Sequence, residues 1–358
     1  MKTGVAYLPL HYGKAPKWLF SRMVELAREI IIAITSEYGA QEVLKRLADP
    51  IWFQAFGSVL AYDWHSSGLT TTTTGAIKEG IRGLEEDLGF FVAGGKGRTS
   101  LKTPDEIQRW AERVSLGRNP ADLIYASRLS AKVDNTALQD GFQIYHHAFI
   151  FTREGKWAVV QQGMNTENCW ARRYHWLSDD VHDFVDEPHS GIISKHKRKN
   201  PLNMVAHESN EARKVSTELA KEKPTKTITV VERLKEIKLP ARHEIFFRDL
   251  RTKNLNRILL KTYEQQPQNF EQLLGIRGVG PKTVRALALI SELVYGAKPS
   301  YTDPVRYSFA HGGKDGHPYP VNKAQYDKSI EILRKALMEA KIGRTEKLQA
   351  LKRLVSTE

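Results

Sequence analysis

Cysteine is almost missing from this 358-residue chain, in which Cys169 is the only example. One cysteine excludes a disulfide framework, a zinc module with several cysteine ligands and an iron–sulfur cluster held by four cysteines. Long apolar runs are missing too. The most apolar stretch, residues 23–34, contains three charged residues and is shorter than the roughly 20 apolar residues that cross a bilayer. The N-terminus shows no signal-peptide pattern, so the sequence predicts a cytoplasmic protein without a membrane partner.

Acidic residues are in the minority. The chain has 54 Lys and Arg against 41 Asp and Glu, which gives a formal net charge of +13. This excess favours a polyanionic partner, either a nucleic acid or an acidic membrane surface. Because no membrane segment is evident, nucleic acid is the expected partner. An apolar fraction of 41% is ordinary for a globular protein, and the length predicts two or three domains.

Helical and β patterns succeed one another along the chain. Apolar residues recur at helical spacing from Trp18 to Ile34, and a further helix is predicted at 74–88. Two runs rich in β-branched and aromatic residues, 143–152 and 156–164, flank a short glycine-containing turn and predict a hairpin, with a third strand at 171–177. The sequence therefore predicts an α-rich α+β fold. A helical N-terminal region is expected at 1–120, and a β-containing region at 121–190 is expected to pack with it as one catalytic domain. A basic linker or arm is expected at 191–226, a helix-hairpin-helix DNA-binding domain at 227–345 and a tail at 346–358.

One segment has a clear mechanism for binding phosphate. Residues 269–295 read NFEQLLGIRGVGPKTVRALALISELVY, two amphipathic stretches joined by a glycine-containing turn. Glycines permit a tight turn and close approach to phosphate, and the amides at the start of the second helix favour an anion. This is the helix-hairpin-helix pattern of proteins that bind DNA without sequence specificity; an ordinary helical turn with a glycine cap is the alternative. The predicted DNA contacts are Gly278, Val279, Gly280, Lys282, Thr283 and Arg285.

Polar residues surround the predicted hairpin at positions where a buried strand is expected to be apolar. Carboxylate, imidazole and amide oxygen suit a hard divalent cation that activates water against a phosphodiester. The sequence therefore predicts a catalytic site that uses Mg²⁺ or Mn²⁺, and a structural role is the alternative for any single histidine. The catalytic candidates are Asp134, Asp140, His146, His147, Gln161 and Gln162, among which Asp134, Asp140 and His147 are the predicted metal ligands.

Two loops add candidates. The loop DWHSSGLTTTTTGA begins at Asp63 and precedes a predicted helix. Asp63 and His65 are predicted to bind metal or move a proton, and a Ser/Thr-rich capping loop is the alternative. The loop GGKGRTS lacks the spacing of a nucleotide-binding P-loop. It is predicted to touch nucleic acid through Lys96 and Arg98, with a solvated loop as the alternative.

Two resemblances extend these predictions. The segments GVAYLPLHYGKAPKWLF, FGSVLAYDWHSSGLTTTTTGAIKE, ALQDGFQIYHHAFIF, WAVVQQGMN and ARRYHWLS resemble a prokaryotic family, common in archaea, catalogued as domain of unknown function 763. Residues 242–310 resemble the helix-hairpin-helix core of the DNA glycosylase superfamily that includes endonuclease III. In that superfamily a lysine after the hairpin forms a Schiff base with the sugar and a downstream aspartate assists, so the resemblance assigns these roles to Lys282 and Asp303. Asp303 lies a few residues farther downstream than is usual, and the cluster cysteines are missing, so no iron–sulfur cofactor is expected.

Three functions remain open. The leading hypothesis is a DNA-processing enzyme, namely a metal-dependent nuclease that acts in DNA repair. It is expected to bind the DNA backbone and to have repair proteins as further partners. The second is a DNA glycosylase or abasic-site lyase that uses Lys282 and Asp303. The third is a noncatalytic DNA-binding protein.

Overall fold

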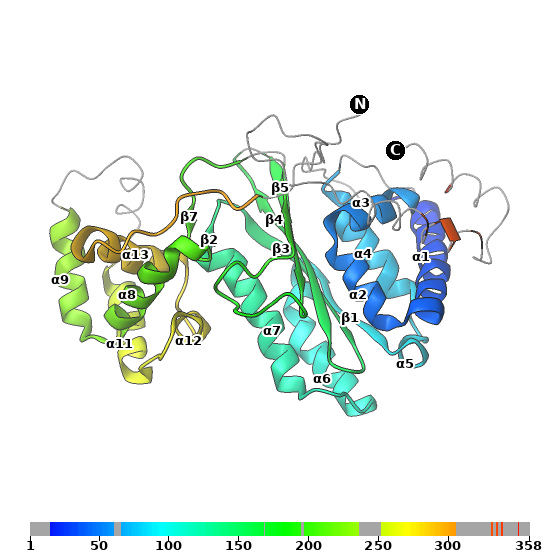
Figure 1. Ribbon diagram of the computed structural model, residues 1–358, viewed down its shortest axis with the longest axis horizontal. Helices are drawn as coiled ribbons and strands as arrows, with labels where there is room; N and C mark the ends of the chain where they lie inside the picture. Colours follow the sequence, from blue (N-terminus) through cyan, green and yellow to red (C-terminus); the bar gives the residue numbers. More distant parts are fainter. Residues whose placement is uncertain are drawn as a thin grey trace.

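A five-stranded antiparallel sheet divides the molecule into two parts (Figure 1). The computed structural model describes residues 15–60, 66–167, 169–194, 197–235 and 252–305, and five single positions after residue 330. The strand order is β1-β3-β4-β5-β6, in which β3, β4 and β5 form a meander. The strands are β1 (Phe90–Lys96), β3 (Gln143–Thr152), β4 (Trp157–Asn165), β5 (Trp170–Leu177) and β6 (Gly191–Ile193), and β2 (Leu138–Gln139) pairs with β7 (Leu202–Asn203) in a second, two-stranded sheet.

The α-rich α+β class predicted from the sequence is confirmed, and so are the hairpin and the third strand. Strand β1 lies in a region expected to be helical. Its sequence FFVAGGK begins with an apolar run and has two glycines before the final lysine, so it lacks the alternation of a typical strand. Gly94 has a φ of +84°, and a Cβ there would lie 2.3 Å from the carbonyl oxygen of His147 on β3. Only glycine allows β1 to approach β3 this closely.

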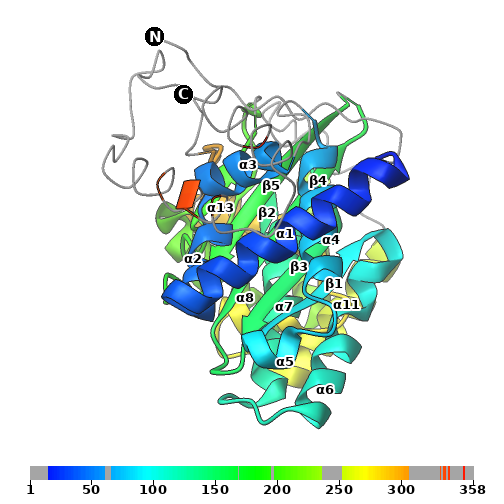
Figure 2. The ribbon, with the colours of Figure 1, turned by 90° about the vertical axis from the view of Figure 1, so that its right-hand side faces the viewer.

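Four helices from the N-terminal region cover one face of the sheet, which we call the α2 face (Figure 2). Helices α2 and α4 contact the strands, and α1 packs on the outside of both. The apolar core between them and the sheet includes Ile30, Phe53, Ile150 and Val160. The helices are α1 (Lys17–Tyr38), α2 (Ala40–Ala48), α3 (Pro50–Val59) and α4 (Gly68–Gly80), followed by the short α5 (Glu85–Leu88).

Helix α4 differs from the prediction. The expected helix 74–88 begins six residues earlier, at Gly68, and ends at Gly80. Threonine is a poor helix former, so local propensity favours a loop at 70–74. Thr70, Thr73 and Thr74 are nevertheless buried against the sheet. Tertiary packing and buried hydrogen bonds therefore outweigh the helix propensity of this stretch.

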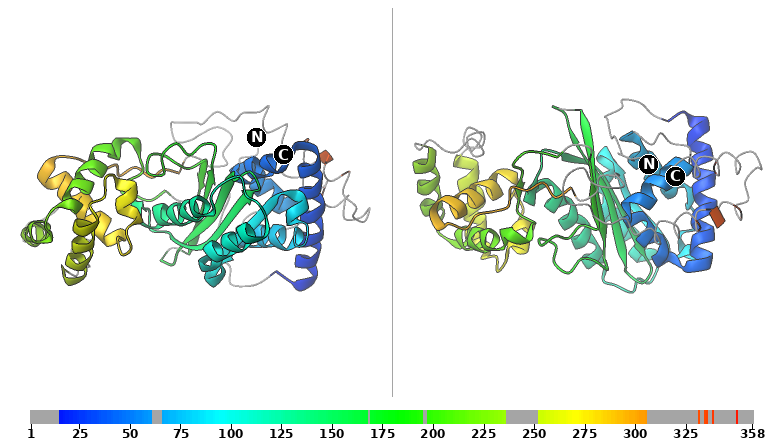
Figure 3. Two further views of the ribbon diagram at one scale, coloured as in Figure 1. Left: turned by 90° about the horizontal axis from the view of Figure 1, so that it is seen from below. Right: turned by 45° about the horizontal axis from the view of Figure 1, so that its top comes forward.

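The opposite face of the sheet, the α7 face, is covered by α6 (Thr103–Arg113) and α7 (Pro120–Lys132). Beyond them lie the C-terminal helices, at the far end of the molecule from α1 (Figure 3). One apolar core runs without interruption from the sheet into these helices, from Phe149 through Leu129 to Leu287. The C-terminal helices are α8 (Asn210–Lys221), α9 (Pro224–Lys235), α11 (Thr252–Gln265), α12 (Phe270–Gly275) and α13 (Pro281–Tyr295).

The structure corrects the expectation that the segment 191–226 is a linker or arm. It contains β6, β7 and α8, and the α8 residues Ala212, Ser216 and Leu219 are buried. Part of the charge of the segment comes from Lys197, Arg198 and Lys199, which are exposed between β6 and β7. Of the expected C-terminal tail, 346–358, only position 350 is among the described residues, and positions 242–251 lie outside them. Within the described part of the chain, no helix combines the length and apolar character needed to cross a membrane.

An irregularity in β3 changes which face two residues occupy. Strict alternation predicts Tyr145 on the face of His147, and Ile144 on the face of His146. The pairing with β4 shifts between Ile144 and His146, as at a β-bulge. Ile144 consequently packs on the α7 face, and the Tyr145 hydroxyl contacts Gln162 on the α2 face. The extra residue of a bulge reverses the alternation beyond it.

Candidate functional site

Three neighbouring strands each carry two adjacent polar residues that are almost completely buried. Successive side chains of a strand point to opposite faces of a sheet. One member of each pair therefore lies on the α7 face and the other on the α2 face. The polar residues that were predicted to form one catalytic site consequently form several separate clusters. The pairs are His147 and His146 on β3, Gln161 and Gln162 on β4, and Arg172 and Arg173 on β5.

On the α7 face, Asp134 is the centre of a buried cluster. It lies in a π-helical turn, Val133–Ala137, that continues α7. Its carboxylate accepts hydrogen bonds from Trp176 Nε1 at 3.0 Å, from His189 Nε2 at 2.5 Å and from Gln161 Nε2. The carboxylate is completely inaccessible to solvent, and His189 is 7% exposed. A buried carboxylate needs such partners, because an unpaired charge in the interior is strongly unfavourable.

From Asp134 the hydrogen-bond chain continues through Gln161 to His147 and Ser127. The Gln161 amide nitrogen also donates to the carbonyl of Ser130, so its Oε1 accepts from His147 Nδ1 at 2.8 Å. His147 Nε2 is then the acceptor of the Ser127 hydroxyl at 2.9 Å. These donor and acceptor roles require that the His147 imidazole is neutral, with its proton on Nδ1. Burial lowers the pKa of His147, in agreement with the neutral form.

On the α2 face, Arg173 is completely buried, with uncharged partners. Its Nε donates to His175 at 2.8 Å, its Nη2 to Gln54 at 2.8 Å and its Nη1 to Thr70 at 3.3 Å. The guanidinium also lies 4.7 Å from the ring centre of Phe53. Within the described part of the chain, no carboxylate pairs with it. Burial accordingly lowers the pKa of Arg173 to about 9.

Gln162 and His146 complete the polar cluster of this face. Gln162 Oε1 accepts from Thr70 at 2.5 Å, and its Nε2 donates to the Ser67 carbonyl at 2.9 Å. His146 Nε2 lies 3.0 Å from the Thr74 hydroxyl. Because that hydroxyl already donates to the carbonyl of Thr70, His146 is the donor and its bare Nδ1 is buried without a hydrogen-bond partner among the described residues. Burial lowers the pKa of His146 to about 3.

Asp140 belongs to a third cluster, where Arg172 joins it to Asp303. Arg172 Nη1 donates to Asp140 at 2.8 Å, and Nη2 donates to Asp303 at 2.8 Å. The Tyr174 hydroxyl also donates to Asp140, at 2.7 Å. Asp303 further accepts from the backbone amide of Arg198 at 2.7 Å. All three charged side chains are at most 3% exposed. This ion-pair network fastens residues 300–305 to the edge of the sheet.

The structure therefore separates the predicted metal ligands. Asp134 and His147 share one hydrogen-bond chain through Gln161, and Asp140 lies with Arg172 in another cluster. Among the described residues, no group of three or more His, Cys, Asp or Glu side chains is arranged to hold a metal ion. Asp63 and His65 lie outside the described residues. His189 could not be predicted as a site residue, because no local sequence pattern marks a histidine that reaches a carboxylate 55 positions away.

Two helices joined by a turn occupy the segment predicted to bind DNA. Helix α12 ends at Gly275, and α13 begins with Pro281 at its first turn. Gly278 has a φ of +107°, a conformation that favours glycine. Arg277, Gly278 and Lys282 are exposed, whereas Val279 and Thr283 are buried. The exposed part of the segment is therefore the turn and the start of α13, where free backbone amides favour an anion.

Contacts from the middle of the chain hold this hairpin in place. Gln139 Nε2 donates to the Pro281 carbonyl at 2.8 Å, and Arg285 Nε donates to Gln139 Oε1 at 2.7 Å. Lys132 Nζ donates to the Ile276 carbonyl at 3.3 Å, and burial lowers the pKa of Lys132. Arg285 is only 9% exposed. It thus faces the sheet region, and Lys282 is the exposed cation at the start of α13.

The other two predicted DNA contacts lie far away in the sequence, at the end of β1. Lys96 ends the strand opposite His146, and Arg98 lies in the 3-10 turn Gly97–Lys102. Both side chains are exposed. Their positions are compatible with a loop that contacts nucleic acid and also with a loop that contacts only solvent.

Comparison with known proteins identifies the family. Residues 4–321 match the family described as Protein of unknown function (DUF763), so the chain belongs to that family. No curated protein and no solved structure matches the chain. The resemblance of residues 242–310 to DNA glycosylases stays a prediction.

Proposed function

We propose that this protein binds the phosphate backbone of DNA through the turn 276–280 and the start of α13. The observation that carries the proposal is the exposure of Gly278 and Lys282 at a helix N-terminus, on a hairpin held by hydrogen bonds from Gln139 and Lys132. Backbone amides and a lysine at such a position bind phosphate without reading bases. The net charge of +13 adds long-range attraction to a polyanion. We place this activity in DNA repair in the cytoplasm, with repair proteins as further partners.

A second candidate is metal-dependent cleavage of DNA. The contact of Asp134 with His189 favours it, because this histidine connects the buried carboxylate with the surface loop that precedes β6. Carboxylate and imidazole are ligands that suit Mg²⁺ or Mn²⁺ in combination with water. A site of this kind requires Asp134 to exchange some of its present hydrogen bonds for metal coordination.

The glycosylase or lyase alternative has less support from the geometry. Lys282 is exposed, whereas lysines that form Schiff bases are usually desolvated or lie beside other cations. Asp303 is buried in two ion-pair contacts with Arg172 and accepts two backbone amides. It therefore acts as a structural anchor in this conformation.

Replacing Lys282 by alanine tests the binding proposal. Fluorescence anisotropy with a labelled duplex, at several salt concentrations, measures the affinity and its salt dependence. Loss of one phosphate contact is expected to reduce the slope of log K against log salt by about 0.9. Lys298→Ala is the matched control, since this exposed lysine lies beyond the other end of α13. Equal curves for both variants would refute the assignment of the hairpin.

The same protein preparation distinguishes binding from catalysis. It is incubated with undamaged and abasic DNA, with and without EDTA and with borohydride. Cleavage that EDTA abolishes indicates the nuclease, and covalent trapping that Lys282→Ala abolishes indicates the lyase. A shift of DNA without either reaction indicates a noncatalytic binding protein.

A further inference from the structure

Leu101 is the most exposed large apolar side chain in the described part of the chain, at 78% exposure. It lies in the 3-10 turn Gly97–Lys102, which follows β1 at the edge of the five-stranded sheet. Single exposed apolar residues are common on protein surfaces. The position of Leu101 differs from these, because hydrogen bonds fix the backbone around it and its charged neighbours all have the same sign.

The backbone is held on both sides of the leucine. Before the turn, the amide of Gly94 donates to Glu106 at 2.7 Å, and the carbonyl of Gly94 accepts from Lys78 at 2.9 Å. At the end of the turn, Thr103 Oγ1 donates to the carbonyl of Ser100 at 2.7 Å. The leucine thus projects from a fixed backbone, and a partner that buries it does not first have to order the turn.

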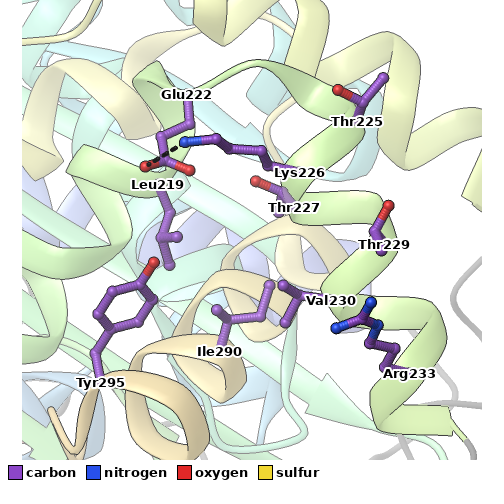
Figure 4. A pocket seen from close by; sticks show the side chains of 10 residues that line it. All are labelled: Leu219, Glu222, Thr225, Lys226, Thr227, Thr229, Val230, Arg233, Ile290 and Tyr295. Atoms are coloured by element: carbon purple, nitrogen blue, oxygen red, sulfur yellow. Dashed lines mark ion pairs between the residues drawn. The ribbon is translucent and has the colours of Figure 1, made fainter.

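The charged side chains next to the leucine are all cationic. The sequence from the end of β1 through the turn is KGRTSLK, with Lys96, Arg98 and Lys102 and no acidic residue. All three are exposed, and none of them forms an ion pair within the part of the chain that the structure describes. The pocket among α8, α9 and α13 shows the contrasting arrangement, in which Lys226 lies 3.8 Å from Glu222 (Figure 4). The cations of the turn are therefore available to an anionic partner.

Duplex DNA is the polyanion that fits an exposed leucine between cations. Proteins that enter the minor groove contact it through Lys and Arg and insert an apolar wedge, such as leucine, between base steps. Binding of a single strand relies on aromatic side chains that stack on bases, and the turn has no aromatic residue. Binding to an acidic membrane surface grows with the apolar area that is buried, and the turn offers one leucine.

We propose that Leu101 inserts from the minor groove between two stacked base pairs of duplex DNA, while Lys96, Arg98 and Lys102 contact the adjacent phosphates. Insertion unstacks the base step and bends the duplex. The inference rests on the proposed function for its partner, DNA, but none of its residues belongs to the hairpin. It adds a contact that deforms the duplex to one that binds the phosphate backbone.

Resonance energy transfer between dyes at the two ends of a duplex of about 20 base pairs measures the bend. Binding of the full chain is expected to increase the transfer, because such wedges bend DNA by roughly 20–90°. Leu101→Ala is expected to abolish the increase and to weaken binding about threefold to tenfold, with the salt dependence unchanged. Leu293→Ala is the matched control, since this leucine is 38% exposed and lies near the end of α13 opposite the hairpin.

Two further variants test the cations. Arg98→Gln and Lys102→Gln are each expected to reduce the slope of log K against log salt by about 0.9, as expected for the loss of one phosphate contact. A slope that neither variant changes would overturn the assignment of the turn to DNA.

The hairpin variant separates this inference from the proposed function. A bend that survives Lys282→Ala and is lost in Leu101→Ala supports the wedge, whatever the hairpin contributes. Duplex binding that depends on Lys282, without a bend that depends on Leu101, overturns the wedge and leaves the proposed function intact. Binding to vesicles of acidic phospholipid that Leu101→Ala abolishes, without a bend in DNA, also overturns it. Absence of duplex binding by the unaltered protein overturns both.

Discussion

His146, His147 and His175 are buried on the central strands, and burial lowers the pKa of each. They are therefore neutral in the folded state at pH values where an unfolded histidine, with a pKa near 6.5, already takes up a proton. Below that pH the unfolded state binds more protons than the folded state. The free energy of unfolding must then fall as the pH drops from about 6.5 towards the folded pKa values.

His146 allows this acid sensitivity to be measured. With a folded pKa of about 3, its protonation in the unfolded state costs about 2 kcal/mol of stability at pH 5. His146→Gln retains a group that can contact Thr74 and does not titrate in this range. Urea unfolding at pH 7.5 and pH 5 should show a loss of stability that is about 2 kcal/mol smaller in the variant. An identical loss in both proteins would show that His146 is not the titrating group.

Asp303 is expected to contribute to stability through Arg172. Asp303→Asn keeps the shape of the side chain and leaves the buried guanidinium with Asp140 as its remaining ion-pair partner. Loss of one partner from a buried charge network is expected to lower the free energy of unfolding by about 2–3 kcal/mol. Thermal unfolding measures the change, with Asp122→Asn, an exposed aspartate 3.7 Å from Arg118, as the control. Unchanged stability together with lost trapping on abasic DNA would instead favour the lyase role.

At the scale of elements, the hairpin and its support come from distant parts of the sequence. The turn 276–280 supplies the exposed amides, and Gln139 and Lys132, more than 130 positions earlier, hold its flanking carbonyls. A phosphate-binding turn works best when its amides are already oriented before DNA arrives. Under the proposed function, we expect these two residues to act on the affinity for DNA without touching it.

Gln139→Ala tests this division of roles. Loss of its bonds to Pro281 and Arg285 should increase amide hydrogen exchange in the turn and weaken DNA binding severalfold, while the salt slope stays the same because no phosphate contact is removed. Gln143→Ala, an exposed residue at the start of β3, is the matched control. A reduced salt slope would mean that Gln139 itself contacts phosphate.

At the scale of the whole molecule, the sheet is shared by two apolar cores. The core on the α7 face continues from Phe149 in the sheet to Leu287 in α13, so the C-terminal helices are not a separately packed unit. A continuous core predicts that the sheet and these helices unfold together. The division into separate domains that the sequence predicted stays a prediction, and the continuous core favours a single unfolding unit.

Leu287→Ala tests this coupling. The residue is completely buried, so the substitution is expected to destabilise the protein by about 2–5 kcal/mol. All seven tryptophans lie before residue 177, so their fluorescence reports on the sheet and the N-terminal helices. The midpoint of the fluorescence transition should fall together with that measured by circular dichroism. An unshifted fluorescence midpoint would establish independent unfolding, and Leu260→Ala, at a residue 47% exposed, is the control.

Features that depend on neighbouring residues could be predicted from the sequence alone. The strands at 143–152, 157–165 and 170–177, the helix beginning at Pro281 and the glycine turn at Gly278 all follow from alternation, helical spacing and backbone freedom over a few positions. The threonine-rich start of α4 and the glycine-containing β1 escaped prediction, since contacts with distant strands stabilise them.

Which polar residues share a site depends on how the chain folds. Gln161 and Gln162 are adjacent in sequence, yet they point to opposite faces and join different clusters. Asp134 meets His189, and Arg172 meets Asp303, across separations of 55 and 131 positions. The physical reason is that a buried polar group must be hydrogen-bonded, and its partner is a group that lies near it in the folded chain, however distant in sequence. Local patterns show that such residues need partners, and the fold determines which partners they have.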